Sequence, residues 1–396
     1  MIFKDSFFYF YMNKPDYDGG SIVNLISSIG RVFKWKSRYN ELRILKSEEL
    51  KKSQKIVLMI IDGLGYEFLM KHGGKTAFNE NLRGKITSVF PSSTSAAVTA
   101  LMTGDSPQEH GMPGWYMFSK EFGSQIIPLP FVLRANRDFK LGHLTDIKDI
   151  FKIEPISKKF KVKVDIIQPM KVKNSAFTLA ASENGKRHGY NSMDEYFKII
   201  KKLVKKKGRR FIYAYYSEHD TLSHDYGLEN KKTLRHFKKL AKKLRSFLKS
   251  LDGKGTTIII TADHGATEVY ESKLIYLKDH PKLKDTLRMP LCGEHRFAYC
   301  YVKPDRIREF EKYIKTKLKY ACDLYRSEDL LKKGYFGKFQ IHKNFRERIG
   351  DYILLMKEHY GIYDLLIHQK SKGSNKGDHG GLSEEELYVP LIVVNK

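Results

Sequence analysis

Three aspartates stand just beyond apolar segments that predict buried strands: Asp62 after residues 56–61, Asp220 after residues 211–216 and Asp263 after residues 257–261. Apolar runs without polar alternation are typical of strands that are covered on both faces, as in parallel sheets. Ligands bind beyond the carboxyl ends of such strands, so we expect the three carboxylates to meet on one rim. Because uncompensated carboxylates repel one another, this rim favours bound cations.

Histidines accompany these aspartates and add nitrogen ligands. His224 follows Asp220 by four residues, a spacing that puts both side chains on one face of a helical turn. His264 is adjacent to Asp263, and His379 lies in an Asp-His-Gly-Gly segment just before the last apolar run. Mixed carboxylate and imidazole ligands suit zinc, with manganese as the second choice. An isolated Asp-Gly is usually only a turn, so the prediction of a metal centre depends on the combination.

A segment rich in hydroxyl side chains supplies candidates for a nucleophile. Small residues follow it up to a Thr-Gly pair at 103–104, which predicts a loop that enters a short helix. A hydroxyl at a helix N-terminus benefits from the positive end of the helix dipole, as does a phosphate bound beside it. The same pattern also suits plain helix capping. The residues alone do not choose among the four candidates, Ser92, Ser93, Thr94 and Ser95.

Helices alternate with the predicted strands. Residues 196–207 and 231–250 carry apolar side chains at helical spacing, with lysine and arginine between them. Together with the flanking strands they predict βαβ units and hence an α/β fold with a mostly parallel central sheet.

Residues 270–345 have a different pattern. They contain a strand-like stretch at 297–302, a helix at 307–318 and glycine-rich turns. We therefore expect a small α+β cap at 270–345, inserted into one large catalytic domain. Two parts of the chain, residues 1–269 and 346–396, form that domain.

Composition narrows the class of protein. The 396 residues carry a formal net charge of +27, and 41% are hydrophobic, which excludes a wholly disordered chain. The longest apolar runs are far shorter than the roughly 20 residues of a membrane span, and the stretch at 7–12 does not resemble a signal peptide. Three cysteines exclude a disulfide framework and fit a reducing compartment, so we expect a cytoplasmic protein. The charge is compatible with an anionic partner, but solvating surface lysines explain most of it.

In their order along the chain these motifs resemble the alkaline phosphatase superfamily, and within it the type I phosphodiesterase/nucleotide pyrophosphatase family. The matching residues run from Lys55 to the C-terminus. The resemblance implies a three-layer sandwich and two adjacent metal ions, usually zinc. It assigns the first ion to Asp62, Thr94, Asp263 and His264, and the second to Asp220, His224 and His379. It also selects Thr94 over its neighbouring serines as the nucleophile.

The resemblance implies a two-metal hydrolase that acts on a small anionic phosphoester through a phosphothreonine at Thr94. A phosphodiesterase or nucleotide pyrophosphatase is the first expectation, and a phosphomonoesterase or phosphomutase of the same superfamily is the alternative. Phosphomutases insert a much longer domain than the stretch between Thr94 and Asp220. The chain lacks the Cys-x-Pro-x-Arg motif of sulfatases. A non-catalytic basic protein that binds nucleic acid is a weaker alternative, because the complete ligand set is retained.

Two features differ from nucleotide-hydrolysing members of the family. After the His-Gly pair at 110–111 there is no Asn, where those members place one that contacts the phosphoryl group. Ser95 also follows Thr94, where many members place an apolar or aromatic residue. We expect Trp115 and Arg296 to contact the substrate and His110 to be structural. The sequence does not predict an oligomeric state.

Overall fold

Seven strands form the central sheet of the computed structural model, which describes residues 12–251, 255–366 and 375–396. The strands lie in the order β2-β18-β9-β1-β8-β6-β7. Their bounds are β1 Lys55–Ile61, β2 Leu82–Thr87, β6 Lys163–Pro169, β7 Lys186–Tyr190, β8 Arg210–Tyr216, β9 Thr256–Thr261 and β18 Tyr388–Asn395. Of these described strands, only β18 runs against the others, so the sheet is mixed but mostly parallel, as predicted.

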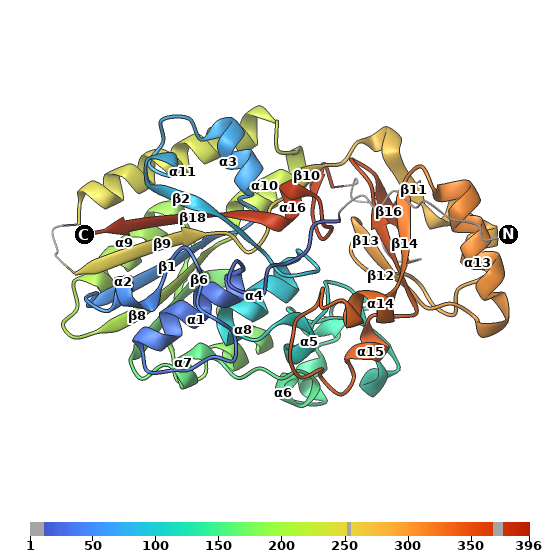
Figure 1. Cartoon of the computed structure of the whole chain (residues 1–396), viewed down its shortest axis with the longest axis horizontal. Coiled ribbons are helices and arrows are strands. Elements are labelled where there is room, and N and C mark those ends of the chain that lie inside the picture. Colours follow the sequence, from blue (N-terminus) through green and yellow to red (C-terminus); the bar gives the residue numbers. More distant parts are fainter. Residues whose placement is uncertain (1–11, 252–254, 367–374) are drawn as a thin grey trace, which may run out of the picture.

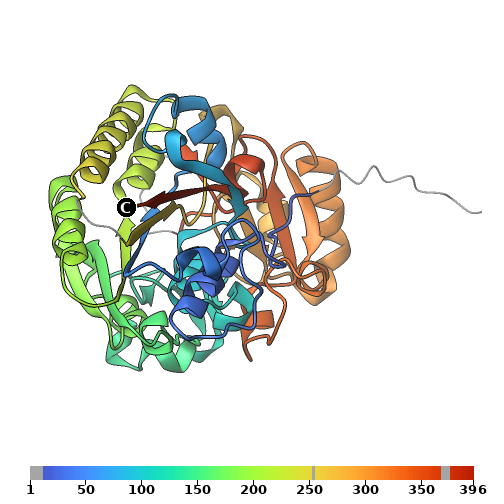
Figure 2. The same cartoon turned by 60° about the vertical axis from the view of Figure 1, so that its left-hand side comes forward.

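Helices cover both faces of this sheet. In Figure 1, helices α3 (Tyr66–His72), α10 (Glu218–Tyr226) and α11 (Lys231–Lys249) lie above it. Helices α1 (Ile22–Val32), α4 (Thr94–Thr103) and α8 (Ala176–Ala181) lie below it. Figure 2 shows the two groups on opposite sides of the strands after a turn of the molecule. The predicted three-layer α/β architecture is confirmed.

The pattern of α11 explains how such a basic helix joins the core. Its buried side chains recur at helical spacing and include Phe237, Leu240 and Leu244, whereas Lys238 and Lys242 between them are exposed. Each fully buried Leu or Phe stabilises the fold by about 1.5–3 kcal/mol. The lysines therefore occupy the solvated face, as the sequence predicted.

Strands β1, β8 and β9 end side by side. Strand β1 pairs in parallel with both neighbours, and Ile61 lies opposite Tyr216 while Ile60 lies opposite Thr261. The loops that follow the three strands therefore leave the sheet at the same edge. This register is what brings the three strand-end aspartates together.

A second, smaller sheet lies at the other end of the molecule, at the right of Figure 1. Its order is β12-β13-β15-β14, and helix α13 (Ile307–Tyr313) continues into a π-helical turn beside it. The strand bounds are β12 Cys292–Gly293, β13 Phe297–Cys300, β14 Cys322–Arg326 and β15 Tyr352–Met356. Strands β11 (Leu274–Tyr276) and β16 (Gly361–Tyr363) pair with each other nearby.

The boundary predicted for the cap at residue 345 is too early. Strand β15 lies between β13 and β14 in the middle of the small sheet, and all five of its residues are buried. It cannot belong to the large domain without breaking that sheet, so the inserted segment extends through β16.

The chain enters and leaves this insertion through a short ribbon. Strand β10 (Thr267–Glu268) comes shortly after β9 and pairs antiparallel with β17 (Gly377–Asp378), with Thr267 opposite Asp378. The two crossings between sheet and cap are therefore hydrogen-bonded to each other.

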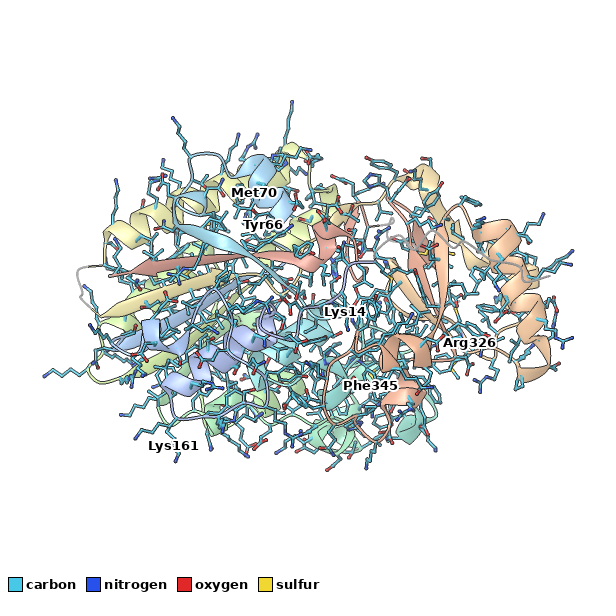
Figure 3. All side chains as sticks on the ribbon, viewed as in Figure 1. Lys14, Tyr66, Met70, Lys161, Arg326 and Phe345 are labelled. Carbon is cyan, nitrogen blue, oxygen red and sulfur yellow. The ribbon has the colours of Figure 1, made fainter. Side chains whose placement is uncertain are left out.

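Charged side chains dominate the outer surface. Long side chains project away from the body on all visible sides in Figure 3, and the labelled Lys161 is among them. Within the described parts of the chain, no helix combines the length and apolar character needed to cross a membrane. The apolar stretch at 7–12, which is not expected to be a signal peptide, lies outside the described residues except for Met12.

A buried ion pair joins the cap to the large domain. Arg296, just before β13, is 1% exposed and pairs with Glu386, which is 0% exposed on α16 (Glu384–Leu387). Its five N–H groups all donate: two to Glu386 and three to backbone carbonyls at 356, 357 and 360. With no donor left over, Arg296 holds the fold together. The expectation that it contacts substrate is therefore wrong.

The buried ion pair of Arg296 with Glu386 predicts a large loss of stability when one of its charges is removed. In Glu386→Gln the buried guanidinium loses its counter-charge, and we expect the free energy of unfolding to fall by about 3–5 kcal/mol. Urea denaturation followed by circular dichroism measures it. Glu384→Gln, on the exposed face of the same short helix, is the control and should change stability by no more than about 0.5 kcal/mol. Equal stability of the two variants would contradict the assigned role.

Candidate metal centre and active site

Asp62 and Gly63 begin the site at the end of β1. Gly63 has φ +73°, and a Cβ on it would lie 2.9 Å from Oδ1 of Asp220. Its backbone N–H donates to Oδ1 of Asp263 at 3.3 Å. The Asp-Gly pair is therefore more than a turn, because only glycine lets the backbone pass between the other two aspartates.

The first group of candidate ligands comprises Asp62, Asp263 and His264, each buried and each offering an atom within 4.8 Å of the others. Nε2 of His264 lies 3.4 Å from Oδ1 of Asp62 and 3.7 Å from Oδ2 of Asp263. The hydroxyl of Tyr215 donates to the other oxygen of Asp62. The sequence analysis missed Tyr215, because nothing in the run of β8 distinguishes it from its buried neighbours.

The second group adds Asp220, His224 and His379. Asp220 and His224 lie on α10 with Nε2 of His224 3.2 Å from Oδ2 of Asp220, as the four-residue spacing predicts. Asp220 and His379 also lie within 4.8 Å of His264 through their ligand atoms, and the rings of His264 and His379 stack at 3.7 Å. The structure thus brings all six predicted carboxylate and histidine ligands into one continuous cluster.

The three histidines share a feature that prepares them as ligands. Nδ1 of each ring faces a backbone carbonyl: His264 that of Gly265 at 2.9 Å, His224 that of Gly377 at 2.8 Å and His379 that of Ser92 at 3.1 Å. A carbonyl only accepts, so in the neutral ring Nδ1 carries the proton and Nε2 directs its lone pair into the cluster. Such second contacts orient histidine ligands in metal proteins.

Each aspartate of the cluster has one carboxylate oxygen without a hydrogen bond. Oδ1 of Asp62, Oδ1 of Asp220 and Oδ2 of Asp263 are buried without a hydrogen bond. Burial and the two neighbouring carboxylates raise the pKa of Asp62 well above its usual value. Burial alone would raise the pKa of Asp220, but the rings of His224 and His379 outweigh it and lower that pKa. Orphaned anionic oxygens beside aligned imidazole lone pairs fit divalent metal ions.

The surroundings shift the pKa values of His379 and His224 in opposite directions. Burial and the adjacent His264 lower the pKa of His379 to about 3. Burial also disfavours a charged His224, but Asp220 and Asp378 outweigh it and raise its pKa to about 10. The raised pKa of His224 thus comes from the negative charge of the rim, the same charge that a bound cation would offset.

Thr94 is the hydroxyl that faces this cluster. It is the first residue of α4, and its Oγ1 donates to Nε2 of His264 at 3.0 Å. The neighbouring serines are fully buried and engaged elsewhere: Ser92 donates to the carbonyl of Gly381, and Ser93 pairs with Ser95. The geometry therefore distinguishes Thr94 from the alternatives that the sequence left open.

A cavity of about 1120 Å³ opens in front of the cluster. Asp62, Thr94, Asp220, His224 and His379 line it, while Asp263 and His264 lie behind them, fully buried. Trp115, expected at the substrate, is part of the wall. Arg296 is not.

The cap contributes two residues, Glu294 and His295, that were not expected at the site. Oε2 of Glu294 lies 3.2 Å from Nδ1 of His379, and Nδ1 of His295 lies 2.8 Å from Oδ2 of Asp378. Both line the cavity. Asp378 was missed altogether, and its position next to His379 was the only signal in the sequence.

His110 lies apart from the cluster, consistent with a structural role. It is fully buried, its Nε2 lies 3.2 Å from the carbonyl oxygen of Ala96, and its Nδ1 accepts from the backbone N–H of Met112 at 3.2 Å. The ring thus fastens the start of α4 to the segment that carries Trp115.

Comparisons with known proteins match the part of the chain that carries these residues. The family model for type I phosphodiesterase/nucleotide pyrophosphatase matches residues 56–382. Murine ectonucleotide pyrophosphatase/phosphodiesterase 5 has a similar structure with a TM-score of 0.61 and 18% identity, covering 85% of this chain and 87% of that chain. Phosphonoacetate hydrolase from Sinorhizobium meliloti 1021, in complex with phosphonoacetate, is also similar. Its TM-score is 0.62 and its sequence identity is 17%, and the match covers 85% of this chain and 89% of that chain. A comparison with curated proteins found no match.

The family match spans the strands and loops that carry every candidate ligand from Asp62 to His379. The protein therefore belongs to the type I phosphodiesterase/nucleotide pyrophosphatase family, a family of enzymes that hydrolyse phosphoester bonds.

Proposed function

We propose that the protein is a two-metal phosphoryl-transfer hydrolase that cleaves phosphodiester or pyrophosphate bonds through Thr94. One observation carries this proposal: the Thr94 hydroxyl lies 3.0 Å from Nε2 of His264, at the edge of a cluster with three unpartnered carboxylate oxygens. A nucleophile, aligned ligands and uncompensated negative charge at one point suit phosphoryl transfer better than any other chemistry.

Asp62, Thr94, Asp263 and His264 would hold one ion, and Asp220, His224 and His379 the other. Zinc is the metal that this ligand set suits best, with manganese second. When bound, the ions polarise the phosphoryl oxygens and lower the pKa of the attacking hydroxyl.

The residues of the chain position the reaction. Thr94 gives up its hydroxyl proton and attacks phosphorus with its Oγ1, the bond to the leaving oxygen breaks, that oxygen takes up a proton, and a phosphothreonine forms. Water then cleaves that ester and restores the hydroxyl. The N-terminus of the ten-residue helix α4 lies at the attacking atom, where the dipole stabilises negative charge. The buried Nδ1 contacts of the three rings keep their ligand atoms in place during both steps.

One comparison and the size of the cavity support this assignment. A threonine-to-alanine variant of murine ectonucleotide pyrophosphatase/phosphodiesterase 5, solved with AMP, is described as inactive. The 1120 Å³ cavity is also far larger than a phosphoryl group needs, which favours a substrate that carries a substituent on both sides of phosphorus.

Removal of the hydroxyl tests the nucleophile. We expect Thr94→Ala to lower kcat by at least about 10³-fold while metal content, measured by plasma emission spectrometry, stays near two ions per chain. Ser95→Ala, the adjacent buried hydroxyl, is the control and should keep its activity and metals. Comparable activity in Thr94→Ala and the wild type would refute the assignment.

Metal removal tests the site itself. Chelation should abolish hydrolysis and destabilise the protein, because an ion present at 100 times its Kd stabilises by about 2.7 kcal/mol. Zinc or manganese should restore both. His224→Gln is expected to reduce the ions bound, whereas His236→Gln, a histidine outside the cluster, should retain both. A purified protein that neither contains nor takes up metal would rule the proposal out.

Paired chromogenic substrates test the bond that is cleaved. Bis(p-nitrophenyl) phosphate should be hydrolysed with a higher kcat/KM than p-nitrophenyl phosphate, because the cavity accommodates a second substituent. A strong preference for the monoester would instead establish the phosphomonoesterase alternative. Retained DNA binding with no hydrolysis of either ester would favour the non-catalytic alternative.

A further inference from the structure

The wall of the cavity is divided by charge. Its four acidic residues are Asp62, Asp220, Glu294 and Asp378, and all of them belong to the cluster or touch its histidines. Arg137, Lys140 and Lys171 line the same cavity. The carboxylates are thus gathered at the candidate metal centre, and cations line the remainder of the wall.

The topology explains this division. Lys171 lies in the short 3₁₀ turn η4 (Met170–Val172) that directly follows β6, the strand next to β8. Along the rim of the sheet, acidic residues therefore follow β9, β1 and β8, and a cation follows β6. Arg137 and Lys140 come from the loop between β5 (Val132–Leu133) and η3 (Leu141–His143).

Arg137 is held in place by a neighbouring aromatic ring. Its Nη2 donates to the hydroxyl of Tyr116 at 3.1 Å, and Tyr116 itself lines the cavity. The ring of Tyr116 stacks on Arg134 at 4.2 Å. Arg134 is buried and donates to Oε1 of Gln125 and to the carbonyls of Leu291 and Asp364. A buried support therefore fixes the position of a cavity-lining cation.

The three cations have no anionic partner of their own. Across the described ranges of the chain, none of Arg137, Lys140 and Lys171 forms an ion pair, although many surface lysines do. The three side chains are exposed, and positive charges that line one cavity without a counter-charge attract an anion into it.

We propose that this part of the cavity binds a second anionic group of the substrate, a phosphate or carboxylate on the part of the molecule that carries no scissile bond. The inference rests on the proposed function for the reacting phosphoryl group. It narrows the substrate class to phosphodiesters or pyrophosphates with a further negative charge beyond the scissile bond. A cavity of about 1120 Å³ is at the upper end for small-ligand sites and accommodates both ends of such a substrate.

A pair of substrates that differ in one group tests the subsite. The p-nitrophenyl ester of thymidine 5′-phosphate is compared with the same ester bearing a 3′-phosphate. We expect the wild type to show a KM about tenfold lower or more for the 3′-phosphorylated ester, since one charge-assisted contact of about 1.4 kcal/mol corresponds to tenfold. In the triple variant R137A/K140A/K171A the ratio of the two KM values should approach one.

A control variant distinguishes a direct contact with the substrate from a general effect of net charge. K238A/K242A/K249A removes three exposed lysines from α11 and lowers the net charge equally, so it should keep the wild-type ratio. If both triple variants lose the ratio together, or if the wild type shows none, the subsite is refuted. Replacing the 3′-phosphate by a 3′-O-carboxymethyl group then distinguishes phosphate from carboxylate preference.

A direct binding measurement tests the anionic subsite independently of the proposed hydrolase function. Calorimetry with the metal-loaded wild type compares thymidine 3′,5′-bisphosphate with thymidine 5′-phosphate and requires no turnover. Tighter binding of the bisphosphate that the cavity variant abolishes would support the subsite even if neither ester is hydrolysed and the proposed function fails. Equal binding of the two nucleotides alongside normal hydrolysis would overturn the subsite and leave the proposed function standing.

Discussion

Mutual repulsion of three buried aspartates is the constraint on which this structure depends. Asp62, Asp220 and Asp263 are brought together because β1, β8 and β9 end in register, and each keeps one oxygen without a hydrogen bond. Carboxylates in such surroundings are tolerated only when cations or protonated groups offset them. The fold therefore supplies a repulsive arrangement of charges that a bound cation would relieve, and the affinity of such a cation would be linked to stability.

The remaining elements serve to place the partners of these aspartates. Backbone carbonyls from three separate segments, at Ser92, Gly265 and Gly377, fix the rings that face the cluster. The first of these also leads into the helix that presents Thr94, so the proposed nucleophile and the candidate ligand His379 share one support. The ion pair of Arg296 with Glu386 ties the cap to the segment just after His379. Packing far from the reacting atoms thus determines where the ligands point.

Sequence patterns predicted the parts of this molecule that depend on local regularity. Strands β1, β8 and β9 and helix α11 follow from apolar runs and helical spacing. Strand β6 was missed because Asp165 interrupts it, and only the fold provides the buried Arg210 that offsets this charge. The role of Arg296 was wrong for the same reason: a buried ion pair and a surface arginine look alike in sequence. The aspartates and histidines of the cluster followed from residue types and spacing and Thr94 from family resemblance, whereas Glu294 enters the site only through tertiary contacts.

The ribbon of β10 and β17 has a consequence for changes in the cap. The cap begins and ends at two paired strands, one shortly after His264 and the other immediately before His379. Because these crossings are bonded to each other, the chain between them can change in length or sequence while the ends stay in register. Changes in the outer part of the cap can therefore alter the covering of the cavity while the paired strands hold His379 in place, provided that the contacts of Glu294, His295 and Arg296 are kept.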